Sequence, residues 1–116
     1  MTNEKVFAMK LSQVYPLLVA KAERKGRTRQ EVDTVTCWLT GYDAEGLAAQ
    51  LARDVDYGTF FREAPAPHPN AHLVKGKICG VRIEDIDDPL MQQIRRLDKL
   101  VDELAKGKPL DKILRQ

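Results

Sequence analysis

The feature that most constrains the fold of this chain is a long, regular pattern of apolar residues over positions 88–106. Its members are spaced alternately by four and three and are widened by two more: Leu90, Ile94, Leu97, Val101 and Leu104, with Met91 and Leu100. This spacing places them on one face of an α-helix. Asp88 before Pro89 is typical of a helix start, and Gly107 is typical of a helix end. We expect the central core helix here; the alternative is an oligomer seam, because the stripe is wide for one neighbour to cover.

The same predicted helix carries oppositely charged residues at helical spacing. Arg95 and Asp98 are three residues apart, and Lys99 and Glu103 are four apart. Side chains at these spacings are neighbours on a helix surface and form ion pairs. We therefore predict both pairs on the outer, solvated face of this helix.

Shorter helices are predicted from start and stop signals. Thr28 and Glu31 form a capping box, in which each side chain accepts a hydrogen bond from the other residue's backbone amide. Gly41 then marks the end of that helix. Pro16 fits a helix only in its first turn, where a missing amide hydrogen costs little. The predicted segments are 12–25, 29–40, a helix after Asp43, a short turn after Asp56 and a short helix after Pro109.

Residues 64–83 interrupt the helical pattern. Three prolines fall within 64–72, which predicts a loop over the body of the protein. Segment 73–83 is rich in Ile and Val but contains Gly76 and Gly80, so a short strand, a small hairpin and an irregular turn all stay open. The prediction as a whole is an all-α single domain over residues 1–116, a small irregular or orthogonal helical bundle with a minor β element around 73–83.

Length and composition agree with one domain. The chain has 116 residues, of which 43% are hydrophobic and 31% charged, enough for one core and a solvated shell. No stretch approaches the ~18 consecutive apolar residues of a membrane span, and the first residues lack a signal-peptide pattern. Cys37 and Cys79 are too few for a disulfide framework, and a single bridge between them is the less favoured alternative. We expect a cytoplasmic protein with reduced thiols and no membrane association.

Five cations cluster at the junction of the first two predicted helices: Lys21, Arg24, Lys25, Arg27 and Arg29. One interpretation is a helix-turn-helix-like junction that binds phosphates, with 29–40 as its recognition helix. Two observations oppose nucleic-acid binding: the whole chain carries only +2, and Glu31 and Asp33 stand where phosphates would approach. The other interpretation is compensation of the negative helix end. If the protein binds a partner, these five residues are the expected contact surface.

Two groups of residues resemble metal ligands at first sight. Four carboxylates fall within Glu84–Asp88, but they lack the spacing of an EF-hand loop and are typical of the residues before a helix start. His68 and His72 are spaced like ligands on a helix, but Pro69 stands between them. We expect no metal site and no cofactor.

An enzymatic pocket is the third candidate site, formed by Tyr42, Cys79 and Arg82. Cys79 lies in a predicted turn beside cations, an environment that lowers a thiol pKa. Cys37 neighbours Trp38 on a helix and is expected to pack as a small apolar group. No nucleophile with a matching base and no phosphate-binding glycine loop is recognisable, so no catalytic residue is assigned.

Several stretches together resemble one bacterial family. They are Val14–Pro16, Val19–Lys21, Lys25–Thr28, Cys37–Tyr42, Ile78–Arg82, Asp88–Met91 and Leu97–Lys108. On these motifs the chain resembles the bacterial domain-of-unknown-function family 2200 over nearly its whole length. The resemblance implies a small, cytoplasmic, mainly helical protein. It implies no activity and no catalytic residues.

Three classes of function are therefore considered. We expect a non-enzymatic binding or interaction module, with self-association as one form of it and the 21–29 junction as its contact surface. A nucleic-acid-binding protein is the first alternative, and it predicts salt-sensitive retention on heparin. An enzyme is the second alternative, and it requires Tyr42, Cys79 and Arg82 to converge in space.

Overall fold

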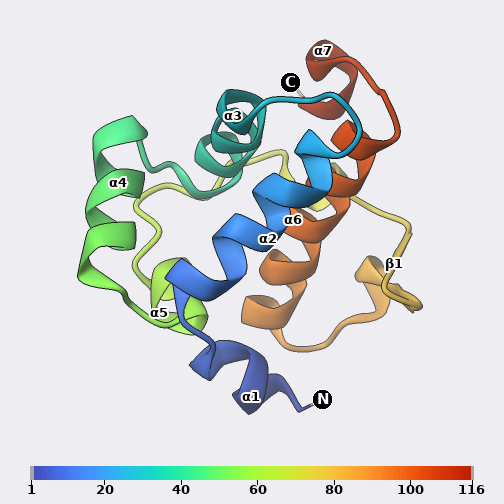
Figure 1. The fold of residues 1–116 in the computed structure, drawn as a ribbon. Helices are drawn as coiled ribbons and strands as arrows, with labels where there is room; N and C mark the ends of the chain where they lie inside the picture. Colours follow the sequence, from blue (N-terminus) through green and yellow to red (C-terminus); the bar gives the residue numbers. More distant parts are fainter. Residues whose placement is uncertain (1, 116) are drawn as a thin grey trace.

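The structure is a computed structural model that describes residues 2–115, and it is mainly helical (Figure 1). The α-helices in this part of the chain are α1 (Asn3–Ala8), α2 (Leu11–Glu23), α3 (Arg29–Thr40), α4 (Ala44–Arg53), α5 (Tyr57–Arg62), α6 (Pro89–Ala105) and α7 (Leu110–Ile113). An antiparallel hairpin, β1 (Lys77–Ile78) with β2 (Val81–Arg82), lies between two 3₁₀ turns, Ala71–Leu73 and Ile83–Asp85. The predicted all-α fold and the minor β element around 73–83 are both confirmed.

Helix α6 is the centre of the bundle. It contacts α2, α3, α5 and α7, and α2 lies beside it in Figure 1. Every residue of the predicted apolar stripe is buried except Leu90, which is half-buried. Met91 and Leu100, which widen the stripe, are 6% and 0% exposed. Neighbours within one chain therefore cover the whole width, so the core-helix prediction is confirmed and the stripe offers no seam for a second copy.

Helix α3 has the predicted boundaries. The Thr28 hydroxyl accepts from the Glu31 amide at 3.2 Å, and the Glu31 carboxylate accepts from the Thr28 amide at 3.0 Å. Gly41 follows the helix with φ +82°, and a Cβ atom there would come within 2.5–2.7 Å of Ala66. The glycine is therefore needed both for its left-handed conformation and for the passage of the 64–72 loop.

Helix α2 begins earlier than its sequence indicates. It starts at Leu11, so Pro16 lies in its second turn, and the prediction that Pro16 occupies the first turn is wrong. Leu11 is fully buried and its amide donates to the Val55 carbonyl at 2.9 Å, while Lys10 forms an isolated antiparallel bridge with Asp56. These tertiary contacts fix the helix start and outweigh the cost of the amide hydrogen that Pro16 lacks.

The two predicted charge pairs on α6 have different outcomes. Arg95 and Asp98 form the predicted ion pair at 2.9 Å, but both residues are half-buried, so the prediction that this pair lies on a solvated face is wrong. The Lys99–Glu103 pair is wrong, because Glu103 is only 6% exposed and accepts from the Arg115 guanidinium at 2.6 and 2.8 Å. Lys99 instead donates to a backbone carbonyl of β1. The chain that returns through α7 brings Arg115 over α6, a long-range contact that local spacing does not reveal.

Helix α1 was not among the predicted elements. The Thr2 hydroxyl accepts from the Lys5 amide at 3.3 Å and caps it. Val6 is 8% exposed, and the helix contacts α5. Six residues are too few to show a periodic apolar pattern, so the sequence did not predict this helix. A helix this short is unstable alone in water, and the packing of Val6 against the core stabilises it.

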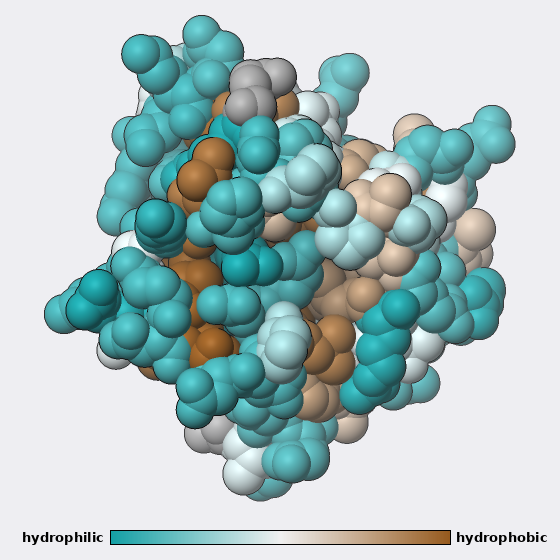
Figure 2. All heavy atoms as spheres, turned by 180° about the vertical axis from the view of Figure 1, so that it is seen from behind, coloured by the Kyte–Doolittle hydropathy of each residue, from teal (hydrophilic) through white to brown (hydrophobic). Residues whose placement is uncertain are grey.

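The surface carries little concentrated apolar area. Figure 2 shows the rear face as mostly hydrophilic, crossed by a narrow hydrophobic strip. The large apolar side chains that are exposed, Leu17, Leu73 and Val81, lie on separate elements of the described chain. Within residues 2–115, no helix has the length and apolar character that crossing a membrane requires.

Candidate functional site

The five cations of the predicted basic run separate into two groups. Arg27 and Arg29 pair with acidic residues of α3, Glu31 at 2.7 Å and Asp33 at 3.8 Å. The other three cations, Lys21, Arg24 and Lys25, lie at the C-terminal end of α2 and share a hollow with α6. The structure therefore brings together three of the five cations, and it pairs the other two with carboxylates of α3.

Arg27 joins two helix ends. Its side chain is 15% exposed, and Nε and Nη2 donate to the Glu31 carboxylate at 3.0 and 2.7 Å. Nη1 donates to the backbone carbonyls of Leu104 and Lys108 at 3.1 and 2.6 Å. The hydrogen bond to Glu31 raises the pKa of Arg27, and the bonds from Arg27 and the Thr28 amide lower the pKa of Glu31. Arg27 thus ties the α2–α3 turn to the end of α6.

A surface hollow of about 790 Å³ lies between the C-terminal ends of α2 and α6. Its lining residues are Lys21, Arg24, Lys25, Asp102, Ala105 and Lys106. Lys21 Nζ is 3.2 Å from one Asp102 oxygen, and Lys106 Nζ is 3.0 Å from the other. Arg24 donates Nε to the carbonyl of Ala20 in its own helix. Within residues 2–115, neither Arg24 nor Lys25 forms an ion pair with a carboxylate.

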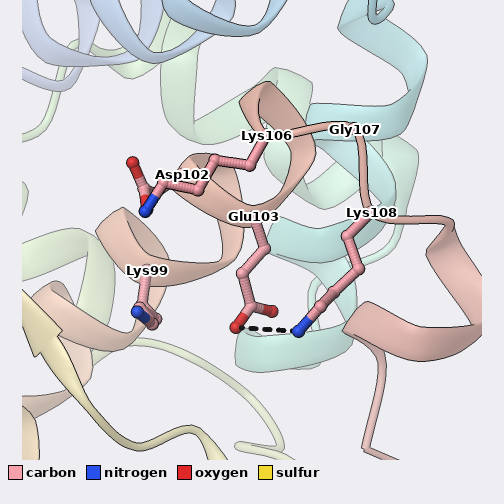
Figure 3. A pocket seen from close by; sticks show the side chains of 6 residues that line it. All are labelled: Lys99, Asp102, Glu103, Lys106, Gly107 and Lys108. Atoms are coloured by element: carbon pink, nitrogen blue, oxygen red, sulfur yellow. Dashed lines mark ion pairs between the residues drawn. The ribbon is translucent and has the colours of Figure 1, made fainter.

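A second hollow of about 390 Å³ lies at the C-terminal end of α6 (Figure 3). It shares Asp102 and Lys106 with the first hollow and adds Lys99, Glu103 and Lys108. Figure 3 shows Lys106 reaching back to Asp102 and Lys108 reaching to Glu103, whose charges are 3.7 Å apart. We call the two hollows together the basic groove.

The basic groove has an excess of positive charge. It contains six cations, Lys21, Arg24, Lys25, Lys99, Lys106 and Lys108, and two carboxylates, Asp102 and Glu103, which leaves four positive charges. The C-terminal ends of α2 and α6 each contribute about half a negative charge. Helix-end compensation therefore uses about one of the four charges, and roughly three are left over.

Asp102 organises the centre of the groove. Burial disfavours its charged form, but hydrogen bonds from Lys106 and Lys21 outweigh burial and lower the pKa of its carboxyl group. Asp102 is therefore ionised at neutral pH and holds two ammonium groups from different helices. A fixed pair of donors at a concave site suits an anionic ligand, because less side-chain freedom is lost on binding.

The structure does not bring together the three residues of the predicted enzymatic pocket, Tyr42, Cys79 and Arg82. Tyr42 is 7% exposed, and its hydroxyl donates to the Phe60 carbonyl at 2.7 Å. Cys79 and Arg82 are exposed on the hairpin, where Arg82 pairs with Glu84 and Asp85. Cys79 lines a cavity with Tyr57 rather than with Tyr42. The three residues are thus committed to different surroundings and do not form a common pocket.

The candidate metal ligands also have other partners. His68 stacks on Trp38 with ring centroids 4.3 Å apart, and its Nδ1 accepts from the Asn70 amide. His72 Nδ1 lies 2.9 Å from the Pro69 carbonyl. Asp88 caps α6 by accepting from two amides of its first turn. Among residues 2–115, no three His, Cys, Asp or Glu side chains gather as metal ligands.

Sequence reasoning missed half of the basic groove, the part supplied by α6 and the turn after it. One signal was present. Both helices end in a glycine between two cations, Lys25-Gly26-Arg27 and Lys106-Gly107-Lys108, and both glycines have positive φ. Two similar basic turns predict two positive helix ends, but their juxtaposition depends on the packing of α2 against α6.

Comparison with known proteins agrees with this fold. The family model described as "Uncharacterized protein conserved in bacteria (DUF2200)" matches residues 5–115. The chain belongs to this family. The crystal structure of the uncharacterized protein SP1917 is similar, with a TM-score of 0.93 and 57% sequence identity over 97% of this chain and 93% of that one. No curated protein matches the chain. The function of the DUF2200 fold therefore has to be inferred from its surface.

Proposed function

We propose that this protein is a non-enzymatic binding module whose basic groove holds a short acidic segment of a partner protein. The observation that carries the proposal is the excess of about three positive charges at a concave surface, beyond what two helix ends need. An extended peptide with several carboxylates fits an open groove in which Asp102 holds two ammonium groups and further cations surround them. Electrostatic complementarity of this kind steers association and selects partners by charge.

An acidic peptide suits the groove better than a nucleic acid does. A helix-turn-helix arrangement would use the start of α3, where Arg27 and Arg29 already pair with Glu31 and Asp33. Those two pairs neutralise the surface that a phosphate backbone would have to approach. The remaining cations surround one groove, whereas a duplex needs contacts distributed along its length.

The experiment is a titration of a fluorescein-labelled poly-glutamate peptide, followed by fluorescence anisotropy at about 50 and about 200 mM salt. The wild type is compared with Lys25→Glu, which reverses one exposed charge of the groove. The matched control is Lys5→Glu, which makes the same change in net charge on the exposed surface of α1. We expect Lys25→Glu to weaken binding about tenfold, and added salt to weaken binding of the wild type.

Equal effects of Lys25→Glu and Lys5→Glu would mean that the peptide responds to net charge and not to the groove. A labelled DNA duplex is titrated in parallel. If the duplex binds more tightly than the peptide and loses affinity with the same variant, the groove is a nucleic-acid site and the peptide proposal is wrong. Absence of binding to both probes removes the anionic-partner function altogether.

We also propose a cytoplasmic location. Cys37 and Cys79 are both free and Cys79 is exposed, which suits a reducing compartment. Self-association is the remaining form of the binding-module hypothesis. It would have to use a surface other than the apolar stripe of α6, which is already covered. Light scattering at increasing protein concentration tests it.

A further inference from the structure

Three carboxylates lie at the end of α6 that is opposite to the basic groove. Asp85, Asp87 and Asp88 precede the first residue of the helix, Pro89, and we call these three residues the acidic end. Figure 1 shows α6 running from the lower part of the bundle, where the helix starts, to the upper part, where α7 lies. The helix has 17 residues, so its two ends are about 25 Å apart.

The acidic end carries more negative charge than its surroundings neutralise. Glu84, the residue before it, pairs with Arg82 at 3.5 Å and accepts from a backbone amide next to β1, so it is committed to the hairpin. Arg82 also lies 3.9 Å from Asp85, but both side chains are exposed, and such a pair contributes little. Asp87 is exposed and forms no ion pair within residues 2–115. The start of α6 offsets about half a charge, so roughly two and a half of the three negative charges are left over.

A hollow of about 410 Å³ adjoins the acidic end. Asp87 and Asp88 line it together with Asn3 of α1. Arg95 lines it as well, but its charge is already paired with Asp98 at 2.9 Å. Among the described residues that line this hollow, the charges without an ion-pair partner are therefore both negative, and they can receive the ammonium groups of another molecule.

We propose that the basic groove of one molecule holds the acidic end of a second copy of this chain. This inference rests on the proposed function of the groove and names its partner. The two surfaces are complementary, with roughly three positive charges left over in the groove and roughly two and a half negative ones at the acidic end. One molecule does not bring its own two surfaces together, because they lie about 25 Å apart and charges act over about 8 Å. The net charge of only +2 leaves little repulsion between copies.

The proposed contact joins two different surfaces, so it is heterologous. A variant that has lost its groove and a variant that has lost its acidic end can therefore still bind each other. General association of a nearly neutral protein has no such property, because it does not depend on which surface each copy keeps. The behaviour of a mixture of two variants thus tests the proposal directly.

Analytical ultracentrifugation of the full chain at increasing protein concentration measures the association. We expect the weight-average mass of the wild type to rise with concentration at low salt, and to rise less at physiological salt. Lys25→Glu reverses a charge of the groove, and Asp87→Lys reverses a charge of the acidic end; each should weaken association about tenfold. Glu45→Lys is the matched control for Asp87→Lys, because it makes the same change in net charge on the exposed surface of α4 and should leave association unchanged. An equimolar mixture of Lys25→Glu and Asp87→Lys should associate more strongly than either variant alone.

NMR on the same variants locates the contact. ¹⁵N-labelled Asp87→Lys keeps its groove, so unlabelled Lys25→Glu should shift its amide signals at Lys25, Lys106 and Gly107. Unlabelled Asp87→Lys should leave those signals unchanged. With the labels exchanged, the shifts should appear at Asp85 and the residues beside it. Circular dichroism melting checks that each variant is folded.

Two results would overturn the inference. One is a wild type that stays monomeric at every concentration in low salt, and the other is a mixture that associates no better than the separate variants. Titration of the wild type with the labelled poly-glutamate peptide separates this failure from failure of the proposed function. If the peptide binds while the protein stays monomeric, the groove takes an acidic segment of a different protein and only the second-copy inference is wrong. If the peptide does not bind either, both proposals are wrong.

Discussion

Replacing Arg27 with methionine tests whether this cation of the basic run stabilises the fold or binds a partner. Arg27 donates four hydrogen bonds, two to the Glu31 carboxylate and one each to the carbonyls of Leu104 and Lys108. Methionine keeps much of the apolar stem and removes the guanidinium, so the change isolates these polar contacts. We expect Arg27→Met to destabilise the protein without removing a cation of the basic groove, which Arg27 does not line.

The magnitude follows from the exposure of the partners. A hydrogen bond to a charged group contributes about 1.5–3 kcal/mol. Glu31 is 24% exposed and Lys108 is exposed, so water replaces part of what is lost there. Leu104 is fully buried, and its carbonyl is harder to hydrate. We therefore expect a loss of about 2–3 kcal/mol, which lowers the melting temperature by about 8–12 °C in a domain of this size.

Urea denaturation followed by circular dichroism measures this loss, with Arg24→Met as the matched control. Arg24 is exposed and bonds only to its own helix, so the control should stay within about 0.5 kcal/mol of the wild type. The pH dependence gives a second readout. Because folding lowers the pKa of Glu31 below its ordinary 4.5, the stability it contributes is complete above 4.5 and is lost as the pH falls through the folded-state pKa.

The difference in stability between the wild type and Arg27→Met should therefore be largest at neutral pH and shrink in acid. Two results would refute the reasoning. One is that Arg27→Met unfolds at the same urea concentration as Arg24→Met. The other is that the difference stays constant through the acid range, because the Glu31 carboxylate would then contribute nothing to the effect of Arg27.

Two substitutions and one chemical modification test local features of the fold. Gly41→Ala should lower the unfolding free energy by about 2–4 kcal/mol, since it adds positive-φ strain to a clash with Ala66; a loss below about 1 kcal/mol in urea denaturation would contradict this. Asp88→Ala should cost about 1 kcal/mol by removing the cap of α6, and a melting temperature equal to that of the wild type would contradict the capping role. Iodoacetamide should modify exposed Cys79 faster than Cys37, whose pKa is raised by burial, and equal rates by mass spectrometry would contradict that difference.

Local signals in the sequence predicted the elements whose stability is itself local. The capping box at Thr28 and the stop at Gly41 place α3 within a residue of its observed bounds, because both act within one turn of the chain. The stripe of α6 also has enough turns for its period to be recognised. Pro16 was misplaced because the start of α2 depends on a bridge to a residue more than forty positions away.

The candidate site depended on long-range packing to a greater degree. The residue types alone placed five cations at one junction. They did not show that two of these cations pair with carboxylates of α3 and that the other three face α6. Arg27 has one partner four residues away and two more that are 77 and 81 residues away. Glu103 likewise pairs with Arg115 and not with the lysine four residues before it. The tertiary fold determines which partners these side chains reach. Sequence spacing along one helix does not predict such contacts.

The net charge of +2 therefore says little about what this protein binds. Four positive charges in the basic groove imply that the rest of the chain carries two negative ones. At physiological salt, charges act over about 8 Å, so an approaching partner responds to the local surface and not to the sum over a molecule that extends 31 Å. On the proposed function, an anionic segment would be attracted to the end of α6 although the molecule as a whole is almost neutral. The same screening makes the attraction selective by position, because a partner must bring its carboxylates to this one end of the bundle.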